Sequence, residues 1–412
     1  MQKTIGAMRG VSLAALATAS FASVPLAAQT TIAPLVDGDD PEFRIDPITA
    51  GSLKISPSIT ATTRYDSNVL ADVANNEIED VEFIVRPEVG VEIGENAFRV
   101  NFNGFGQFSR FADLSTENSD TYGADLGFNY SPSQGETLRT QVGYARLAED
   151  RGDPEARNVA GPGPRLIDDL FAEVRYRNEG GRILLDLEAV ARELDAVSAI
   201  DDDRDFTSYG GRATVGYRVS GPVYATVTGF ATYRDFVLPP TPTDPDRDAT
   251  TYGGRVGISF VDNDRIRGRV GVGIFQFDPQ DARLDSRSGL SVDASISLLI
   301  DRRAAIIVDA FRGDVATFRA GAQARTDTRA AVTAQVEMRH NFYGRVGLRY
   351  RDTNFIGSGI SEETYGPNIA VEFLANRNLS LIADATVSER VSDDLFENFE
   401  RFRAGVTARI RF

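Results

Sequence analysis

The chain is poor in the side chains that most catalytic and metal sites use. It contains no cysteine and a single histidine, His340, which excludes thiol chemistry and makes a histidine-based zinc site improbable. A serine hydrolase needs a base, usually histidine, and His340 falls where a short turn is predicted, away from the longer loops. We therefore expect no enzyme activity, no cofactor and no metal.

Carboxylates are abundant, and two uses of them are conceivable. A glycosidase needs two acids about 5–10 Å apart, one of them in an apolar setting, which any pair of acids in a folded chain could satisfy by chance. Acidic tracts, such as 201–203, could bind calcium or bridge to lipopolysaccharide through divalent ions. Because these tracts lack the other ligands of a calcium loop, solvated surface loops explain them better.

Arginine is the residue type whose chemistry and placement are most informative. Lys54 is the only lysine after residue 28, so almost every cation is a guanidinium, whose planar fork binds carboxylates of neighbours and of acidic solutes alike. The formal charge of the whole chain is nevertheless -16. That charge argues against nucleic acid as a partner, since nucleic-acid binding requires a basic surface.

The N-terminus has the features of a secretory signal over residues 1–28. Lys3 and Arg9 precede an alanine-rich apolar stretch that ends in small residues before Gln29, as in cleaved signals. Residues 29–52 form an acidic segment with several prolines, expected to be a periplasmic tail or a small insert in a lumen. After residue 28 no run of 18 apolar residues remains, so we expect no membrane-spanning helix.

From residue 53 to the end, apolar and polar residues alternate in runs of roughly 10–16, which is the period of β-strands. In the last run, Phe402, Val406 and Ile410 share one face, whereas Arg403 and Arg409 share the other. The runs are separated alternately by tight turns and by longer, mostly acidic segments. Short turns are expected at 94–96, 131–135, 178–181, 220–222, 262–264, 301–303, 341–344 and 376–378, and longer segments near 66–79, 112–119, 149–165, 195–205, 235–248, 278–286, 313–327, 353–362 and 390–397.

This layout predicts an all-β fold, with residues 53–412 forming a single closed antiparallel transmembrane β-barrel of about 18 strands, or 16 if one hairpin is misassigned. Short turns on one side and long acidic extracellular loops on the other are typical of bacterial outer-membrane barrels. A soluble β-sandwich or propeller is the alternative. The segment 313–327 differs from the other longer segments because it carries no net charge.

A weak repeat supports the barrel. Four strands open with Tyr-Gly after a longer segment, and a second aromatic follows eight residues later on the same face. About 20 Å of height would separate the two, close to the apolar band of about 25 Å. We interpret the pairs as two aromatic girdles in contact with lipid: Tyr122 and Tyr130, Tyr209 and Tyr217, Tyr252 and Phe260, and Tyr365 and Phe373.

If the apolar faces point to lipid, many arginines point into the lumen. There they could select anionic solutes, or they could pair with acids on neighbouring strands and brace the wall, and the sequence does not choose between these roles. The candidate lumen or selectivity residues are Arg64, Arg139, Arg175, Arg177, Arg212, Arg218, Arg255, Arg269, Arg345 and Arg349.

The longest segment, 149–165, is the best candidate for a loop that folds inward and narrows the lumen. It carries Arg151, Arg157 and Arg165 among Asp150, Asp153 and Glu155. Its Gly-Pro-Gly-Pro run at 161–164 is equally compatible with an exposed tip.

Two short stretches resemble a known family. Residues 43–47 (Phe-Arg-Ile-Asp-Pro) and 64–69 (Arg-Tyr-Asp-Ser-Asn-Val) resemble the type 2 β-barrel porins grouped with exopolysaccharide-locus outer-membrane barrels of Proteobacteria. The terminal Arg411-Phe412 looks like the C-terminal aromatic signal read by the barrel assembly machinery. The resemblance implies an outer-membrane barrel that passes or anchors polysaccharide, with no catalytic residues.

Three functions are compatible with these features. The leading expectation is a passive outer-membrane channel, with export of an anionic polysaccharide as its specific form. The others are a closed structural or adhesive barrel with partner-binding acidic loops, and a general diffusion porin for small nutrients. Expected partners are outer-membrane lipid, lipopolysaccharide, the barrel assembly machinery and periplasmic polysaccharide-export components.

Overall fold

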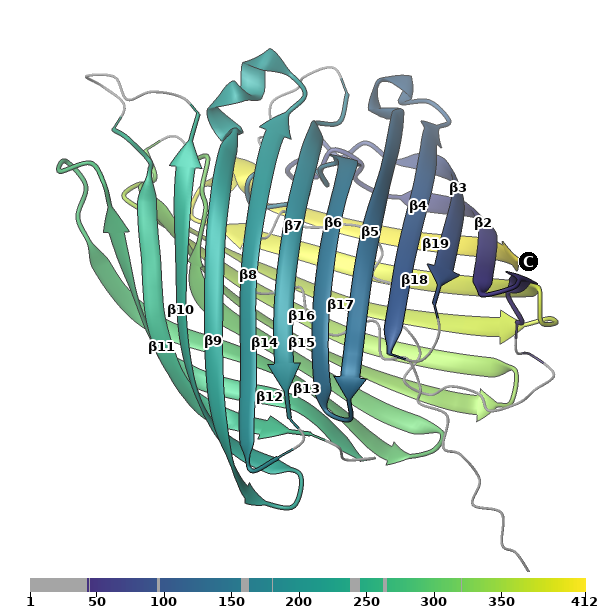
Figure 1. Cartoon of the computed structure of the whole chain (residues 1–412). Coiled ribbons are helices and arrows are strands. Elements are labelled where there is room, and N and C mark those ends of the chain that lie inside the picture. The colour runs from purple at the N-terminus through teal and green to yellow at the C-terminus, as the bar shows by residue number, and fades with distance from the viewer. Residues whose placement is uncertain are drawn as a thin grey trace, which may run out of the picture.

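The molecule is a closed antiparallel β-barrel in which each strand from β2 (Leu53–Asp66) to β19 (Phe399–Arg411) pairs with its sequence neighbours (Figure 1). A computed structural model describes residue 43 and residues 45–94, 97–156, 163–179, 181–237, 245–261, 265–319 and 321–412. β19 pairs with β2 and closes the circle, so the prediction of an all-β barrel of 18 strands is confirmed. In the described part of the chain no helix is long and apolar enough to cross a membrane. The signal expected at residues 1–28 lies outside the described residues.

The strands are long, because uninterrupted period-two alternation lets each one pair along both edges. Three short 3-10 helices, η1 (Ser115–Glu117), η2 (Ala199–Arg204) and η3 (Leu395–Glu397), occupy longer loops. The strands are β1 (Ile48–Ala50), β2 (Leu53–Asp66), β3 (Asp80–Ile93), β4 (Phe98–Phe111), β5 (Ser119–Ser133), β6 (Glu136–Ala148), β7 (Leu166–Asn178), β8 (Ile183–Ala196), β9 (Phe206–Ser220), β10 (Val223–Phe236), β11 (Ala249–Phe260), β12 (Ile266–Pro279), β13 (Arg287–Asp301), β14 (Ala304–Val315), β15 (Ala324–Arg339), β16 (Phe342–Ile356), β17 (Ile360–Leu374), β18 (Leu379–Ser392) and β19 (Phe399–Arg411).

Two of the expected longer segments are shorter in the structure. The prediction for 353–362 was wrong, since β16 and β17 leave only residues 357–359 between them. Gly357 and Gly359 adopt positive φ angles of 98° and 70°, which a turn this tight requires and glycine permits. The prediction for 313–327 was also wrong at both ends, because β14 continues to Val315 and β15 begins at Ala324.

The seam between the first and last barrel strands is reinforced at both ends. β2 pairs with β19 from Ser58 to Asp66, and at the loop end the carboxylate of Asp66 accepts hydrogen bonds from Arg401 at 2.6–3.0 Å. At the short-turn end, β1 pairs with the beginning of β2, and the backbone N–H of Phe412 donates to the Pro57 carbonyl at 3.0 Å. The last residues of the segment expected as a tail therefore extend the sheet.

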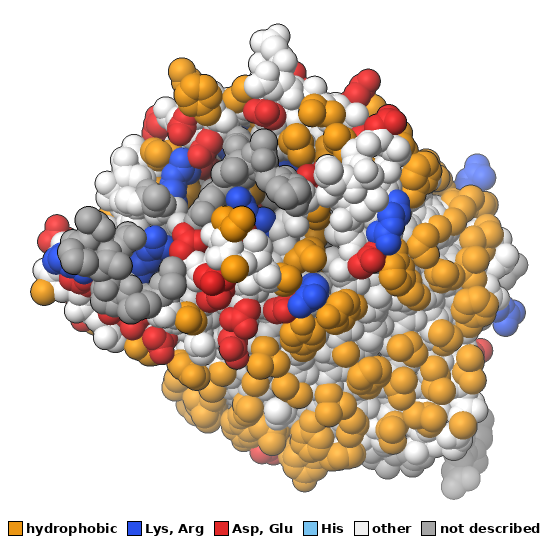
Figure 2. All heavy atoms as spheres, turned by 90° about the horizontal axis from the view of Figure 1, so that it is seen from above, with side chains coloured by type: hydrophobic (Ala, Val, Ile, Leu, Met, Phe, Trp, Pro, Cys, Tyr) orange, Lys and Arg blue, Asp and Glu red, His pale blue; other side chains and the backbone are white. Residues whose placement is uncertain are grey.

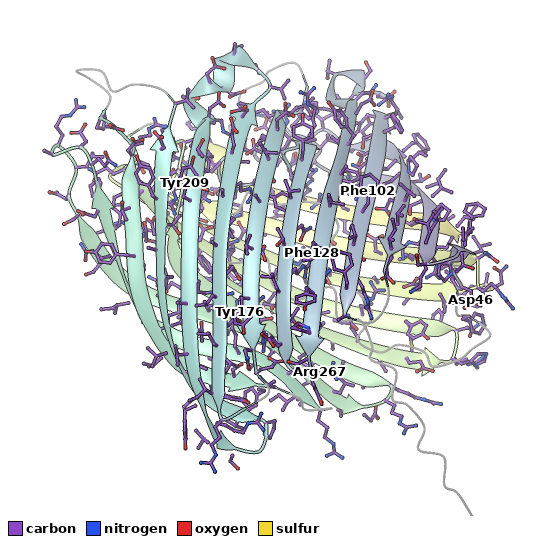
Figure 3. All side chains as sticks on the ribbon, in the orientation of Figure 1. Asp46, Phe102, Phe128, Tyr176, Tyr209 and Arg267 are labelled. Atoms are coloured by element: carbon purple, nitrogen blue, oxygen red, sulfur yellow. The ribbon has the colours of Figure 1, made fainter. Side chains whose placement is uncertain are left out.

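Side chains alternate between an apolar outer face and a polar inner face. Hydrophobic side chains cover the flank of the barrel, and charged side chains gather over the loops (Figure 2). Tyr209 lies near the loop end and Tyr176 near the short-turn end (Figure 3). Of the eight aromatics expected in the girdles, seven are exposed and Phe260 is partly buried. Between them on the outer face lie apolar residues such as Leu126 and Val256, 48% and 67% exposed, whereas contact of the girdles with lipid stays a prediction.

Candidate functional site in the barrel lumen

The end of the β14–β15 hairpin leans into the lumen. β13 and β14 stop pairing at Val292 and Arg312, although both strands continue towards the loops. Beyond that point Asp314 lies against the inner faces of β10, β11 and β13. Its side chain is fully buried and accepts hydrogen bonds from Arg234 and Arg287, both at 2.6 Å, and from Thr251 at 2.9 Å. We call residues 313–319 and 321–327 the hairpin tip.

Apolar contacts hold the same side of the hairpin tip against the wall. Ala316 packs with a buried cluster from β7, β8 and β9, and Ala324 packs with a second cluster from β11 and β12. The ring of Phe318 lies 5.7 Å from that of Phe206 and 6.3 Å from that of Phe236. Burial of these groups inside a barrel mouth is favourable because it removes apolar surface from the lumen water. The clusters are Ile167, Leu194, Phe206 and Ala316, and Ala249, Phe275, Phe277 and Ala324.

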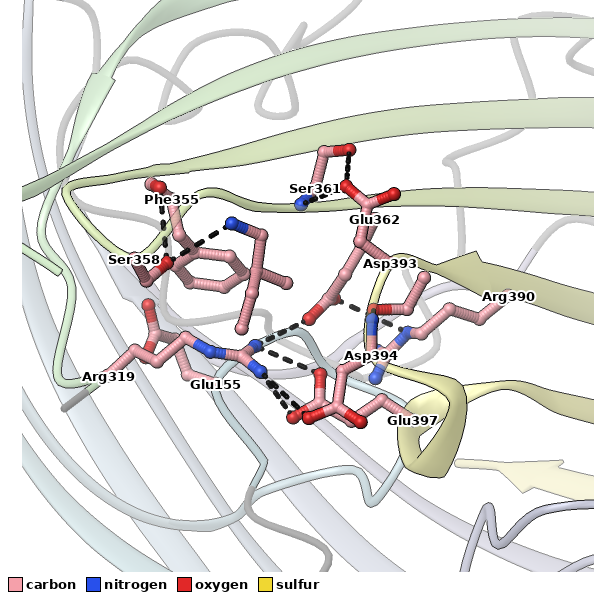
Figure 4. Close-up of polar contacts among 12 residues, drawn as sticks. Glu155, Arg319, Phe355, Ser358, Ser361, Glu362, Arg390, Asp393, Asp394 and Glu397 are labelled. Atoms are coloured by element: carbon pink, nitrogen blue, oxygen red, sulfur yellow. Dashed lines mark hydrogen bonds and ion pairs between the residues drawn. The ribbon is translucent and has the colours of Figure 1, made fainter. Parts of the chain in front are cut away.

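The opposite side of the hairpin tip is bound by ion pairs to β16, β17 and η3. Arg319 donates to Glu362 at 2.8 Å and to both carboxylate oxygens of Glu397, at 2.9 and 2.5 Å (Figure 4). Asp327, whose side chain is fully buried, lies 3.2 Å from Arg325 and 2.6 Å from Arg351. The hairpin tip thus connects the β7–β13 side of the wall with the β16–β19 side.

The described part of the loop between β6 and β7 folds into the barrel mouth and is not an exposed tip. We call residues 149–156 the loop segment. Asp150 accepts hydrogen bonds from Arg401 at 2.7 Å and Arg403 at 2.8 Å, and the Gly152 carbonyl accepts one from Arg390. These partners lie on β18 and β19, far from β6 and β7 around the barrel. Inward folding of the loop segment therefore narrows the mouth.

Glu155 joins the loop segment to the hairpin tip. Its carboxylate accepts a hydrogen bond from Arg325 at 2.8 Å and one from the backbone N–H of Phe318 at 3.1 Å. Glu155 and Arg325 are both buried. A buried charge is costly without a partner. The ion pair between these two residues therefore keeps the loop segment bound to the hairpin tip.

The arginines expected at the constriction brace the loop. Arg151 donates to both oxygens of Glu117, at 2.8 and 3.2 Å, and to the Gly163 carbonyl at 2.6 Å. Arg165 lies 3.2 Å from Asp201. Arg157 lies outside the described residues, as do residues 158–162.

Two aspartates of the loop segment have opposite electrostatic environments. Burial opposes ionisation of Asp150, but the charges of Arg401 and Arg403 outweigh it and hold the pKa of Asp150 well below its usual range. Burial raises the pKa of Asp153 well above its ordinary value, and the neighbouring Asp150 raises it further. Among the described residues Oδ2 of Asp153 has no hydrogen-bond partner, so Asp153 favours the protonated, neutral form.

Most of the arginines expected in the lumen are paired with acids on the same face. Arg175 binds Asp186 at 2.6 Å, and Arg345 binds Glu372 at 2.7 Å. Arg255 and Arg269 share Asp293, and Arg255 also lies over the ring of Phe230. Such ladders support the bracing role, whereas solute selection stays a prediction. Arg64 pairs with Glu82, Arg212 with Glu188, and Arg177 with Glu179.

The remaining three candidates have other environments. Arg218 donates to the Tyr224 hydroxyl, near the short turns, and Arg139 donates to Gln141 at 3.2 Å. Arg349 is exposed on the inner face of β16.

The residues that narrow the mouth were mostly missed from the sequence. Asp314, Phe318, Arg319 and Arg325 fall in a segment that period-two reasoning treated as a surface loop. One signal was present: this segment alone among the longer ones has no net charge, as expected if its charged residues are paired and buried rather than solvated.

An 18-strand closed barrel with an apolar outer face and a charged inner face defines the class of transmembrane β-barrels found in bacterial outer membranes. The chain belongs to the family described as "Putative beta-barrel porin 2", which matches over residues 40–412. The resemblance seen in the sequence is thereby confirmed, and the chain is a porin-like barrel protein.

Several solved structures are similar to this chain but share little sequence with it. The outer membrane protein OpdK from Pseudomonas aeruginosa is 12% identical, with a TM-score of 0.48, over 87% of this chain and 99% of that one. OccK2 (OpdF) of the same organism is 11% identical, with a TM-score of 0.47, over 87% of this chain and 98% of that one. The FrpB iron transporter of Neisseria meningitidis is 9% identical, with a TM-score of 0.45, and the match covers 81% of this chain but only 62% of FrpB. No curated protein matches the sequence.

Proposed function

We propose that this protein is a passive outer-membrane channel whose outer mouth is narrowed by the hairpin tip and the loop segment. The observation that carries the proposal is that part of the inner face below the mouth is open to water. Arg86, Glu88 and Arg269 are 28%, 40% and 31% exposed there, whereas other charged residues of the wall, such as Arg212 and Glu188, are buried in ion pairs. A closed 18-strand barrel is wide enough for an aqueous lumen, and solutes would cross it without an energy source.

Export of an anionic polysaccharide is the more specific form of this proposal. The arginine content of the inner face supports it, because guanidinium groups bind the carboxylates of acidic sugars. A polymer would have to displace the hairpin tip and the loop segment, whereas a small solute needs only a gap beside them. The geometry therefore favours small solutes in the state described, and polymer export requires an opened state.

A closed structural barrel is the second candidate, and one observation favours it. Ion pairs between neighbouring strands occupy most of the inner arginines, as expected for a braced wall. Catalysis has less support, since His340 lies in the turn between β15 and β16, far from the mouth. We further propose residence in the outer membrane, with lipid and lipopolysaccharide around the barrel, insertion by the assembly machinery, and periplasmic export components as partners in the polysaccharide form.

Swelling of liposomes that contain the refolded protein tests the channel. The channel proposal predicts swelling in isosmotic small sugars and sugar acids, with rates that fall steeply as solutes lengthen to oligosaccharides. Swelling that is equally fast for long anionic oligosaccharides would favour polysaccharide export. An absence of swelling, from protein that migrates as a folded heat-modifiable barrel, would overturn the channel and leave the structural barrel.

A further inference from the structure

Arg349 differs from the other arginines on its strand. It lies at the middle of β16 on the inner face and is exposed. Arg345 and Arg351, on the same face, are bound to Glu372 at 2.7 Å and Asp327 at 2.6 Å. Within the described part of the chain, Arg349 makes no hydrogen bond or ion pair. It therefore offers an uncompensated guanidinium to the lumen, halfway along the barrel and below the hairpin tip.

The neighbours of Arg349 leave room for a ligand. Directly opposite it are Ala331 on β15 and Gly366 on β17, the smallest side chains available. The diagonal neighbours, about 7–8 Å away between Cα atoms, are not acidic: Arg329, Thr333, Thr364 and Asn368. Asp309 on β14 pairs with the far side of Ala331, so it lies two strand spacings, or about 10 Å, from Arg349. An ion pair between Arg349 and a wall residue is thus absent for a structural reason.

A second cation adjoins this opening. The guanidinium of Arg329 lies 4.6 Å from the ring centroid of Phe311, and its side chain is 31% exposed. Its acidic neighbour Asp327 is 3.7 Å away and is shared with Arg325 and Arg351. Asp327 therefore neutralises Arg329 only in part, and the positive charge of Arg349 is reinforced.

We propose that Arg349, with Arg329 and Asn368 beside it, forms a binding site for the carboxylate of a hydroxylated acid such as a sugar acid. This inference rests on the proposed channel function and names its solute class. A free guanidinium fork binds a carboxylate through two parallel hydrogen bonds. The amide of Asn368 and the hydroxyls of Thr333 and Thr364 supply donors and acceptors for the hydroxyl groups of the same solute.

Calorimetric titration of the refolded barrel in detergent with glucuronate tests the site without requiring passage. We expect the protein to bind glucuronate and not glucose. The affinity for glucuronate should be about tenfold lower in Arg349→Gln, because the variant loses one pair of charge-assisted hydrogen bonds. Arg349→Lys keeps the charge but lacks the planar guanidinium, so its affinity for glucuronate should lie between those of the unaltered protein and Arg349→Gln. The control Arg345→Gln with Glu372→Gln removes a neighbouring ion pair at constant net charge and should bind as the unaltered protein does.

Two results would overturn the site: equal affinity in Arg349→Gln and the unaltered protein, or an equal loss in the Arg345 and Glu372 control, which would indicate nonspecific lumen charge. Liposome swelling separates this outcome from failure of the channel. Binding without swelling would retain the site and reject passage, whereas swelling without Arg349-dependent binding would retain the channel and reject the site.

Discussion

Glu155 is the residue on which the closed arrangement of the mouth depends most directly, because it binds both Arg325 and the backbone of Phe318. Glu155→Gln removes the charge and leaves Arg325 with Asp327 alone. We expect the docking of the loop segment to weaken by roughly 2 kcal/mol. Single-channel recordings should then show longer occupancy of a larger conductance level. Glu193→Gln, at an exposed glutamate on β8, is the control, and matching recordings from the two variants would refute the role of Glu155.

We expect Asp153 to make the opening of the mouth depend on pH. In an undocked loop its pKa would be near the ordinary value of about 3.9, whereas burial in the docked loop raises the pKa well above that. A group whose pKa is raised by docking stabilises the docked state fully below its ordinary pKa, and the stabilisation is lost as pH rises through the raised value. Openings should therefore become more frequent with rising pH.

Asp153→Asn removes this titration, while Arg351 and Arg390 nearby stay charged. The variant should stay docked at pH values where the unaltered protein opens, so its opening frequency should change less between about pH 4 and pH 8. Openings with the same pH dependence in both proteins would show that other groups control the mouth.

At the residue level the sequence allowed a sound expectation of which arginines occupy the inner face, because period two assigns alternate residues to opposite faces. It did not show that Arg349 is free and Arg345 paired. Arg349 lies directly opposite Gly366, whereas Arg345 lies diagonally opposite Glu372. This difference depends on the register between strands, which is set only in the assembled sheet.

The hairpin tip is held by Asp314, whose fully buried carboxylate lies between Arg234 and Arg287. Asp314→Asn leaves the buried Arg234 and the partly buried Arg287 without their counter-charge. Such a change costs about 3–5 kcal/mol in buried pairs. The tip should then swing away from the wall. Because the chain has no cysteine, a single Ala316→Cys reports the movement through its labelling by a membrane-impermeant maleimide.

Labelling of Ala316→Cys should be slow in the otherwise unaltered protein, where Ala316 is buried. It should rise by about a hundredfold with Asp314→Asn. Asp285→Asn, at an exposed loop residue, is the matched control and should leave the rate unchanged. Rapid labelling in all three proteins would show that the tip is not docked.

A buried ion pair also stabilises β2 at its seam with β19. Asp66→Asn removes the bidentate partner of Arg401, which keeps Asp150. We expect loss of roughly 2 kcal/mol and a lower temperature for the shift from folded to unfolded migration on gels. An unchanged transition, relative to Asp285→Asn, would mean that the β2–β19 pairing alone closes the barrel.

Among elements, the strand count and the short turns that the structure describes could be predicted, since turn residues and period two are local properties. The turn expected at 262–264 lies outside the described residues, as do residues 95, 96 and 180 of two others. The inward course of the hairpin tip could not be predicted. Residues 313–319 and 321–327 contain alternating polar and small residues that fit a surface loop. Several of them are buried by contacts with β7–β13, with β16, β17 and η3, and with Glu155 of the loop segment. Those contacts join segments that lie far apart in the sequence.

The whole molecule combines a closed wall with two inward segments, which Glu155 joins by accepting hydrogen bonds from Arg325 and from the backbone N–H of Phe318. The wall satisfies its backbone groups by closure, which allows it to cross lipid without helices. Charged residues of the two segments, among them Asp150, Glu155 and Arg319, bind partners across the mouth. We therefore expect the lumen beneath the two segments to be water-filled and these pairs to limit passage.

Single-channel conductance in planar bilayers tests this expectation most directly, with the refolded mature protein compared with the double variant Glu155→Gln and Asp314→Asn. We predict small, stable conductance steps for the unaltered protein and larger steps for the double variant, with both migrating as folded, heat-modifiable barrels. Silence from both folded proteins would contradict a water-filled lumen. Steps of equal size would contradict control of passage by the two inward segments.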